Sequence, residues 1–268
     1  MIDPLQAIFL SLVQGVTEFL PVSSSAHLIL VPSLLGWPDQ GLAFDVAVHM
    51  GTLVAVLFFF RRDLCAVGGL LFAKRSTQAS HEAAHITGMV MIASVPVFAV
   101  AVALEDLIET VLRHPQVIAS TTAVFGVLLW SADRLGRRHR AVETMRWSDA
   151  LCIGLAQALA LVPGVSRAGI TITAALALGL DRQSAVKFSF MLAIPVIFAA
   201  GVFKGVGLVL APVPVAWNIL ALGTVLSALS AYAVLVVFLR VIERTGMLVF
   251  VVYRLVLAAF LFYWFQST

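Results

Sequence analysis

Long apolar segments separated by short polar ones dominate the chain. A helix that crosses a hydrocarbon core of roughly 30 Å needs about 20 apolar residues. Segments of that kind lie at residues 42–60, 84–103, 116–133, 186–208, 215–239 and 246–265. They lack the polar–apolar alternation of a membrane β-barrel, and a helix pairs its backbone polar groups internally. The pattern therefore predicts an all-α polytopic membrane protein with six transmembrane helices.

Two further apolar regions are interrupted by polar residues. Residues 2–35 contain Pro21 followed by three serines at 23–25, and residues 148–180 contain the stretch PGVSR at 163–167. Each half of these regions is too short to cross a membrane comfortably. Irregular backbone at membrane depth is tolerated only where protein or a polar cavity satisfies it. We therefore expect two re-entrant helical hairpins, each with a polar turn inside the membrane.

The composition supports a membrane protein over a soluble one. Hydrophobic residues make up 61% of the chain and charged residues 12%, and the mean hydropathy is +1.04. Soluble domains contain about 25% charged residues. The isoelectric point near 9.2 could suggest nucleic acid, but the basic residues are placed as membrane topology requires, so no nucleic-acid partner is expected. Cys65 and Cys152 offer no disulfide or metal-ligand spacing.

The positions of lysine and arginine test this topology. The loops 61–83, 134–147, 181–187 and 240–245 hold 4, 5, 2 and 2 of them, which is 13 of the 17 in the chain. If both interrupted regions are re-entrant, all four loops fall on one side, which the positive-inside rule assigns to the cytoplasm. A crossing at either region would split the basic loops between the two sides. Both chain termini are then expected on the outer side of the cell membrane.

The same order of elements occurs twice in the sequence. A hairpin and three spans at 1–133 are followed, after the basic loop 134–147, by a hairpin and three spans at 148–268. Because three spans are an odd number, the second unit has to be inverted relative to the first. In inverted-repeat membrane proteins the site lies between broken helices near the midplane. We therefore expect the two polar turns to meet there.

Both turns have the properties of an anion site. Ser23 or Ser24 is expected to cap the helix after Pro21, and Ser166 the helix after Gly164. Helix N-termini present unpaired N–H groups and a positive dipole end to anions, phosphate above all. Arg167 adds a charge whose fork geometry matches phosphate oxygens. The candidate phosphate-binding residues are Ser23, Ser25, Gly164, Ser166, Arg167 and Arg254.

Glu18 would repel an anion on its own, so a divalent cation between its carboxylate and a phosphate is expected. Gln14 lies one turn earlier and is a second candidate metal ligand. His27 follows Ser24 by three residues and is a candidate general base, general acid or nucleophile. The purely structural alternatives are that the serines only cap helices, that Gln14 only packs, and that Glu18 and Arg167 form a structural ion pair. Ionisable groups inside membranes are expensive, which favours function.

Arg254 is a third charge at membrane depth, about 12 Å into the last helix at 1.5 Å per residue. It needs a partner, for which Asp45 and Glu18 are candidates, or it reaches the bound anion. A structural ion pair is the preferred interpretation. His49 lies one turn from Asp45 and could face the same cavity, but a packed, hydrogen-bonded role is preferred for it.

The sequence resembles the bacterial undecaprenyl-diphosphate phosphatases, also called bacitracin-resistance proteins. The resemblance covers almost the whole chain. It rests on QGVTEFLPVSSSAH at 14–27 and PGVSRAGIT at 163–171, and more weakly on FDVAVHMGT at 44–52 and YR at 253–254. Together the two long motifs are highly specific for this family.

The resemblance implies an enzyme of the bacterial inner membrane that removes one phosphate from undecaprenyl diphosphate, recycles the cell-wall lipid carrier and confers bacitracin resistance. It implies a polyprenyl diphosphate substrate, membrane lipids as partners, Mg²⁺ or Ca²⁺ as cofactor and a site that opens to the outer face. A homo-oligomer is possible. By motif position, Gln14 and Glu18 would serve the metal, Ser24 and His27 would be the catalytic pair, with Glu18 assisting, and Ser166 and Arg167 would bind phosphate.

The sequence departs from the family pattern at three places, because Gln14 replaces a frequent Glu, Ala168 a frequent Ser, and Ser25–Ala26 a frequent Thr–Gly pair. None of these changes removes Glu18, Ser24, His27 or Arg167.

Three chemistries stay open: attack by Ser24 with His27 as base, attack by His27, and attack by metal-bound water. The rival function is an inverted-repeat transporter or flippase for an anionic lipid or small anion. A nucleophile beside a base favours the enzyme, since a carrier needs neither.

Overall fold

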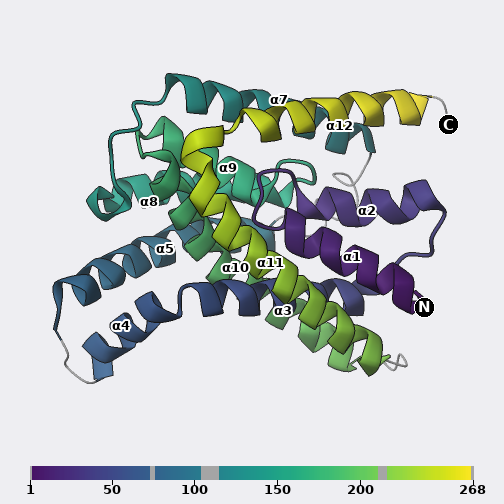
Figure 1. Cartoon of the computed structure of the whole chain (residues 1–268), viewed down its shortest axis with the longest axis horizontal. Helices are drawn as coiled ribbons and strands as arrows, with labels where there is room; N and C mark the ends of the chain where they lie inside the picture. Colours follow the sequence, from purple (N-terminus) through teal and green to yellow (C-terminus); the bar gives the residue numbers. More distant parts are fainter. Residues whose placement is uncertain (1, 73–75, 104–114, 211–215, 267–268) are drawn as a thin grey trace.

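The computed structural model describes residues 2–72, 76–103, 115–210 and 216–266, and within these ranges it contains helices and no strand (Figure 1). The α-helices are α1 (Pro4–Thr17), α2 (Ser24–Leu35), α3 (Gly41–Phe59), α4 (Arg61–Phe72), α5 (Gln78–Ala103), α7 (Pro115–Leu135), α8 (Trp147–Ala158), α9 (Arg167–Ala177), α10 (Arg182–Leu210), α11 (Trp217–Thr245) and α12 (Leu248–Gln266). Two short 3₁₀ helices, η1 (Val142–Thr144) and η2 (Leu159–Leu161), flank α8. The predicted all-α class is confirmed.

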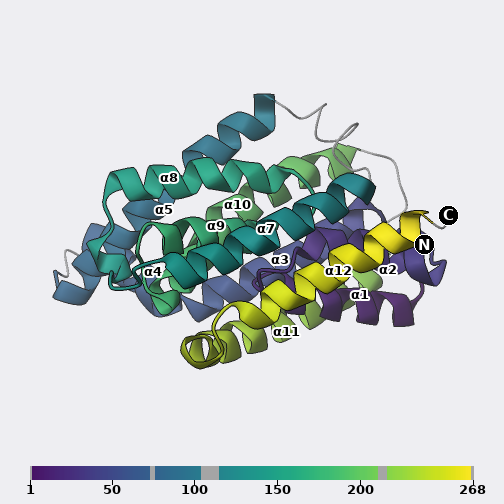
Figure 2. The same ribbon diagram turned by 90° about the horizontal axis from the view of Figure 1, so that it is seen from above.

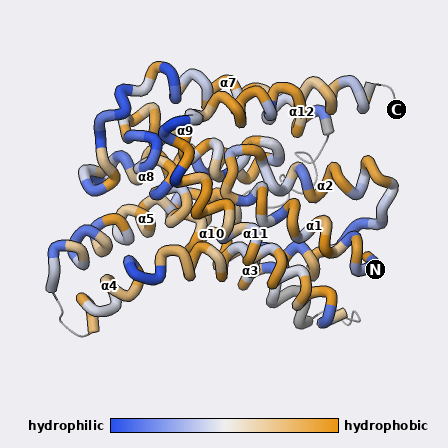
Figure 3. The backbone as a smooth tube through the Cα atoms, viewed as in Figure 1, coloured by the Kyte–Doolittle hydropathy of each residue, from blue (hydrophilic) through white to orange (hydrophobic). Residues whose placement is uncertain are grey.

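Six of these helices are long and apolar enough to cross a membrane, as predicted. These candidate spans are Gly41–Phe59, Gln78–Ala103, Gln116–Leu135, Arg182–Gly205, Trp217–Thr245 and Leu248–Phe265. Hydrophobic residues predominate along α7 and α12, and hydrophilic residues gather at the end of the bundle where α8 begins (Figure 3). Both described ends of the chain lie at the other end of the bundle in both ribbon views (Figures 1 and 2).

The expected loop at 61–83 is partly helical, which corrects the sequence interpretation. Helix α4 occupies its first half and packs against α5, which itself begins at Gln78, before the predicted span. Thr77 caps α5 by accepting the backbone N–H of Ser80 at 3.1 Å. The first turns of α5 are polar. The apolar run in the sequence therefore begins later than the helix itself, and the predicted span begins with the apolar run.

The two interrupted regions form helix pairs. Helix α1 packs against α2 and α8 packs against α9, and each pair reverses direction at the polar turn that the sequence places there (Figures 1 and 2). These four helices, at Pro4–Thr17, Ser24–Leu35, Trp147–Leu161 and Arg167–Ala177, are apolar but shorter than the six candidate spans. Their re-entry into the membrane from opposite faces stays a prediction.

Small residues let α1 and α3 pack closely onto α11. A Cβ atom at Gly15 would overlap Ser230 Oγ, and one at Gly51 would overlap Ser227 Oγ and the carbonyl of Thr224. Ser227 Oγ also donates to the carbonyl of Val48 at 2.8 Å. Small residues and hydroxyl hydrogen bonds are the usual means of association between membrane helices. This packing brings the end of α1 next to the middle of α3.

Ion pairs join the helices at the basic end of the bundle. Arg182 donates two hydrogen bonds to the carboxylate of Asp133, at 2.7 and 2.9 Å. Arg140 donates to Asp149 at 2.6 Å, and the backbone N–H of Arg146 donates to the same oxygen at 2.9 Å. Burial by itself would raise the pKa of Asp149, but these hydrogen bonds outweigh it and lower the pKa below its ordinary value. The pairs fix this end of the fold at neutral pH.

Candidate active site

The turns of the two helix pairs meet in a salt bridge. Glu18 directly follows α1, and Arg167 is the first residue of α9. Arg167 Nη2 donates to Glu18 Oε1 at 2.8 Å, although the two residues are 149 positions apart in the sequence. The convergence of the two polar turns that the inverted repeat predicts is therefore present in the fold.

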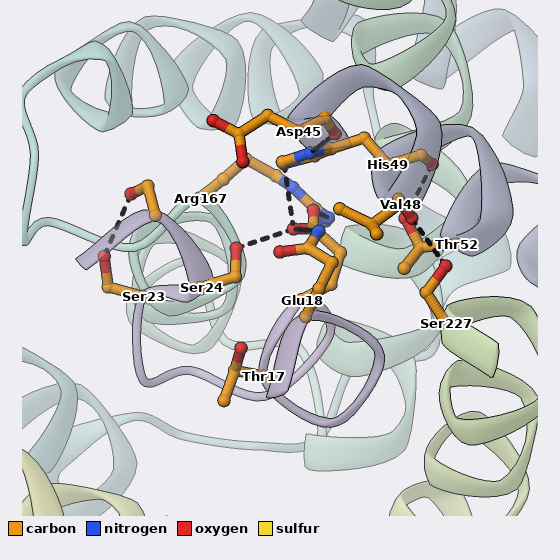
Figure 4. A network of polar contacts seen from close by, with 12 residues as sticks. Thr17, Glu18, Ser23, Ser24, Asp45, Val48, His49, Thr52, Arg167 and Ser227 are labelled. Atoms are coloured by element: carbon orange, nitrogen blue, oxygen red, sulfur yellow. Dashed lines mark hydrogen bonds and ion pairs between the residues drawn. The ribbon is translucent and has the colours of Figure 1, made fainter. Parts of the chain in front are cut away.

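The carboxylate of Glu18 is the centre of the site (Figure 4). Its Oε2 atom accepts hydrogen bonds from Ser24 Oγ at 2.7 Å and from Gln14 Nε2 at 3.0 Å, while Oε1 accepts from Arg167. His49 Nε2 lies 3.8 Å from Oε2 on the side of α3. The carboxylate is thus held next to a hydroxyl, an amide, a guanidinium and an imidazole.

Arg167 is fixed by groups other than Glu18 as well. Its Nη1 atom donates to the carbonyl of Ser189 on α10 at 3.0 Å, and its guanidinium carbon lies 5.8 Å from the centre of the Phe19 ring. Ser189 Oγ and Thr171 Oγ1, both fully buried, lie 2.7 Å apart and join α9 to α10. The charge of Arg167 therefore points into the site before any ligand binds.

Both turns contain a serine with left-handed backbone immediately before the helix. The φ angles are +72° at Ser23 and +71° at Ser166, values that cost a non-glycine residue conformational energy. Ser166 caps α9 as predicted, since its Oγ accepts the N–H of Gly169 at 3.1 Å. Ser23 occupies the cap position of α2 but makes no side-chain capping bond. Such strained residues concentrate at functional sites.

A cavity of about 540 Å³ lies over this group of residues. Ser23, Ser24, Ser25, Ser166 and Arg167 line it together with Glu18, so most of the predicted phosphate-binding residues share one space. Leu28, Ile29 and Pro32 of α2 and Val196, Ile197 and Ala200 of α10 form apolar walls, and Asp45 and His49 contribute from α3. The cavity combines a charged, hydroxyl-rich floor with apolar sides.

Gly164 is needed for packing and does not line the cavity. Its φ is +90°, and a Cβ atom there would overlap Thr121 Oγ1 on α7 and lie 2.5 Å from the carbonyl of Ile118. Glycine is therefore required both by the backbone conformation and by the close approach to α7.

Arg254 holds the two turns together through their backbone. It is fully buried and donates to the carbonyls of Pro21 at 3.2 Å, Gly164 at 2.9 Å and Val165 at 3.1 Å, and to Thr122 on α7 at 3.1 Å. No carboxylate pairs with it in the described part of the chain, so the expected ion pair with Asp45 or Glu18 is wrong. Turn carbonyls without helical partners take the place of a counter-ion. Arg254, a candidate phosphate-binding residue, does not line the cavity.

His27 lies on the other side of α2 from the cavity floor. Its Nδ1 atom is 2.7 Å from the carbonyl of Ser23, and its Nε2 atom is hydrogen-bonded to the hydroxyl of Tyr253. The hydroxyl of Ser24 is bonded to Glu18. The structure therefore pairs Ser24 with Glu18 rather than with His27.

The donor set around Glu18 is compatible with a divalent cation. Gln14 Oε1 is buried and has no hydrogen-bond partner, next to the carboxylate that its amide nitrogen contacts. The described residues contain no group of three or more His, Cys, Asp or Glu side chains that could hold a metal ion. One carboxylate plus substrate phosphates and water is a common arrangement for Mg²⁺. Gln14 and Glu18 would thus supply the protein ligands and the substrate the rest.

A family model described as bacitracin resistance protein BacA matches residues 7–260 of the chain. The chain belongs to the BacA family. It is 52% identical over 263 residues to the undecaprenyl-diphosphatase of Alcanivorax borkumensis, which covers 98% of this chain and 99% of the relative. It is 51% identical over 260 residues to the undecaprenyl-diphosphatase of Teredinibacter turnerae, covering 97% and 98%. To undecaprenyl-diphosphatase 1 of Pseudoalteromonas translucida it is 50% identical over 253 residues, covering 94% and 95%.

The sequence of this BacA-family chain did not indicate two contacts of the site. Ser189 acts through its backbone carbonyl, for which a sequence carries no signal. Tyr253 could have been singled out, because it directly precedes Arg254 in the YR pair of the family pattern. His49 lines the cavity and faces Glu18, which the sequence left open, and its Nδ1 atom makes the preferred hydrogen-bonded contact, 2.7 Å from the carbonyl of Asp45.

Proposed function

We propose that this protein hydrolyses undecaprenyl diphosphate to undecaprenyl phosphate and inorganic phosphate, in the bacterial inner membrane. The observation that carries the proposal is the contact of Ser24 and Arg167 with one carboxylate, Glu18, on the floor of a cavity. A nucleophile, a proton acceptor and a phosphate-binding cation are the groups that phosphoryl transfer needs. About half of all positions are shared with relatives named for this activity. The product would return to cell-wall synthesis as its lipid carrier, and its recycling would confer bacitracin resistance.

In the proposed reaction the hydroxyl oxygen of Ser24 attacks the terminal phosphorus. Its proton passes to Glu18 Oε2, which lies 2.7 Å from that hydroxyl. The bond between phosphorus and the bridging oxygen breaks, and undecaprenyl phosphate leaves. Water then hydrolyses the phosphoserine to release inorganic phosphate. Arg167 neutralises charge on the equatorial oxygens of the phosphoryl group, with the N–H groups at the starts of α2 and α9.

A bound Mg²⁺ or Ca²⁺ would supply further neutralisation of the diphosphate charge. Gln14 and Glu18 are the residues that would hold it, as the partnerless Oε1 of Gln14 suggests. Glu18 would then contact both Arg167 and the cation.

The orientation that we propose follows the charges. Both described ends of the chain lie at one end of the bundle, opposite the end that carries the basic loop before α8 (Figures 1 and 2). If the basic end is cytoplasmic, both termini and the α2–α3 connection lie outside. Trp37 and Asp39 of that connection line the cavity, so the site would open to the outer face. Two inverted repeats, 1–133 and 148–268, would place the turns near the midplane.

The test is release of inorganic phosphate by the purified protein in detergent with undecaprenyl diphosphate as substrate. We expect release that EDTA abolishes and that added Mg²⁺ or Ca²⁺ restores. Restoration by the added cation is the control that distinguishes removal of the metal from irreversible damage to the protein. Absence of release from a well-folded protein would reject the phosphatase and favour a carrier for an anionic lipid, which needs the anion site but no nucleophile.

The apolar walls predict where the prenyl chain lies. The first isoprene units would lie between α2 and α10, and farnesyl and undecaprenyl diphosphate share these units, so Ala200→Trp is expected to reduce kcat/KM for both substrates by about tenfold. Val202→Trp is the matched control, because Val202 is 50% exposed on the same helix and does not line the cavity. An unchanged kcat/KM in Ala200→Trp, or an equal loss in Val202→Trp, would show that this wall does not contact the chain.

A further inference from the structure

His27 and Tyr253 form a hydrogen-bonded pair between α2 and α12. Their rings are stacked, with centroids 5.7 Å apart and an interplanar angle of 12°, and His27 Nε2 is bonded to the hydroxyl of Tyr253. His27 is 9% exposed and does not line the cavity. The reaction proposed above uses neither side chain, although His27 belongs to the first long motif and Tyr253 to the YR pair of the family pattern.

The hydrogen bonds determine which nitrogen of His27 carries the proton. The carbonyl of Ser23 can only accept, so Nδ1 donates to it across 2.7 Å. In the neutral ring, Nε2 is then the acceptor and takes the hydroxyl hydrogen of Tyr253. In the charged ring, both nitrogens donate. In neither form does His27 have a lone pair left for the proton of Ser24.

Ser23, whose carbonyl His27 contacts, has a strained backbone conformation. Ser23 has φ +72°, and its carbonyl accepts both the backbone N–H of His27, at 3.3 Å, and the ring N–H. Ser166, the corresponding residue of the other turn, has its own side-chain cap on Gly169. Ser23 has no such cap. The first turn is therefore held by a ring N–H that donates to the Ser23 carbonyl, whereas the second is held by the Ser166 hydroxyl, which accepts a helix N–H.

The position of Ser24 depends on this arrangement. Ser24 is the first residue of α2, and its backbone direction follows from the left-handed conformation of Ser23. Arg254 fixes the other side of the same turn through the carbonyl of Pro21. Tyr253 and Arg254 of α12 thus hold the turn on both sides of Val22, one through His27 and one directly.

We propose that Tyr253 and His27 are positioning residues, which hold Ser23 in its left-handed conformation so that the Ser24 hydroxyl faces Glu18. The proposal rests on the proposed phosphatase function and assigns the proton transfer to Glu18 alone. A displacement of the nucleophile by about 1 Å can lower the rate by about 100-fold.

Two nearly isosteric variants separate positioning from proton transfer. The amide nitrogen of asparagine can occupy the place of Nδ1, so His27→Asn keeps the bond to Ser23. Glutamine places its amide near Nε2, so His27→Gln reaches Tyr253 and loses the bond to Ser23. Neither side chain can act as a base. We expect His27→Asn to keep kcat within about tenfold of the wild type, and His27→Gln and His27→Ala to lose about 100-fold.

Two further readouts accompany kcat. The pH profile of kcat should keep its shape in His27→Asn, because a positioning residue takes no part in the proton transfer. Tyr253→Phe, which removes the hydroxyl and keeps the stacked ring, should lower kcat about fivefold with an unchanged pH profile. Size-exclusion profiles and thermal unfolding in detergent check that each variant is folded.

The outcomes are distinct. If His27→Asn is as inactive as His27→Gln, or if it loses one limb of the pH profile, His27 transfers protons and the proposal is wrong. If His27→Ala does not fold, the comparison of the asparagine and glutamine variants still decides. Phosphate release by the wild type tests the phosphatase function separately, since the variant ranking has meaning only when that release is observed.

Discussion

Replacing Ser24 by alanine is expected to lower kcat for phosphate release by at least about 10⁴-fold. The hydroxyl is the proposed nucleophile, and loss of a nucleophile in comparable covalent mechanisms has effects of this size or larger. Ser24 Oγ is held at 2.7 Å from Glu18 Oε2, so its removal leaves the acceptor without a proton to take. The measurement is release of phosphate from undecaprenyl diphosphate, together with binding of a non-hydrolysable analogue, which should persist.

Ser25→Ala is the matched control for Ser24. Ser25 lines the same cavity in the next position of the chain, but within the described residues its hydroxyl is hydrogen-bonded only to Ser23, at 3.4 Å. We expect it to lose less than about tenfold in kcat. If the two alanine variants lose activity equally, or if Ser24→Ala stays active, another group is the nucleophile and the role of Ser24 given above is wrong.

Replacing Arg167 by alanine is expected to lower kcat/KM by about 10³-fold. Phosphoryl transfer depends mainly on positioning and charge neutralisation, and a fixed arginine contributes this much in comparable sites. Arg167→Lys should recover only part of the loss, because an ammonium group cannot donate to Glu18, Ser189 and a phosphate with the same fork geometry. Near-normal activity of the alanine variant would remove Arg167 from the mechanism.

Stability has to be measured beside activity for this change. Loss of the guanidinium leaves the buried carboxylate of Glu18 without its cation, which costs about 3–5 kcal/mol when a buried pair is broken. Arg167→Met combined with Glu18→Gln removes both charges and is expected to unfold at a higher temperature than Arg167→Ala, while remaining inactive. Arg182→Ala is the control, since it breaks the pair with Asp133 at the far end of the bundle. It should lower stability and leave kcat within about tenfold of the wild type.

The six long helices were predictable because membrane thickness sets both their length and their polarity. The breaks at Pro21 and Pro163 were equally visible, since each proline stands close to consecutive polar residues, a combination that interrupts an apolar helix. Helix α4 was not visible. It is a short helix at Arg61–Phe72 within a basic segment, and its formation depends on packing against α5 rather than on a membrane-length apolar run.

The composition of the site was predictable, but the partners within it were only partly so. Glu18 and Arg167 were expected to converge because the odd number of spans inverts the second repeat. Spacing placed Ser24 and His27 within one helical turn, yet it could not show which of them faces the other hairpin and which faces α12. Arg254 was assigned a carboxylate partner because a buried charge requires compensation. The carbonyls that the two turns leave outside any helix meet that need instead.

The position of Arg254 in the chain has a consequence for the order of biosynthesis. The carbonyl of Pro21 is made 233 residues before the arginine that binds it, and His27 is made 226 residues before Tyr253. During synthesis the first turn is therefore complete in sequence long before its two stabilising side chains exist. We therefore expect the site to be complete only when the last helix has left the ribosome and docked, so that chains that stop short of α12 contain Glu18, Ser24 and Arg167 but lack phosphatase activity.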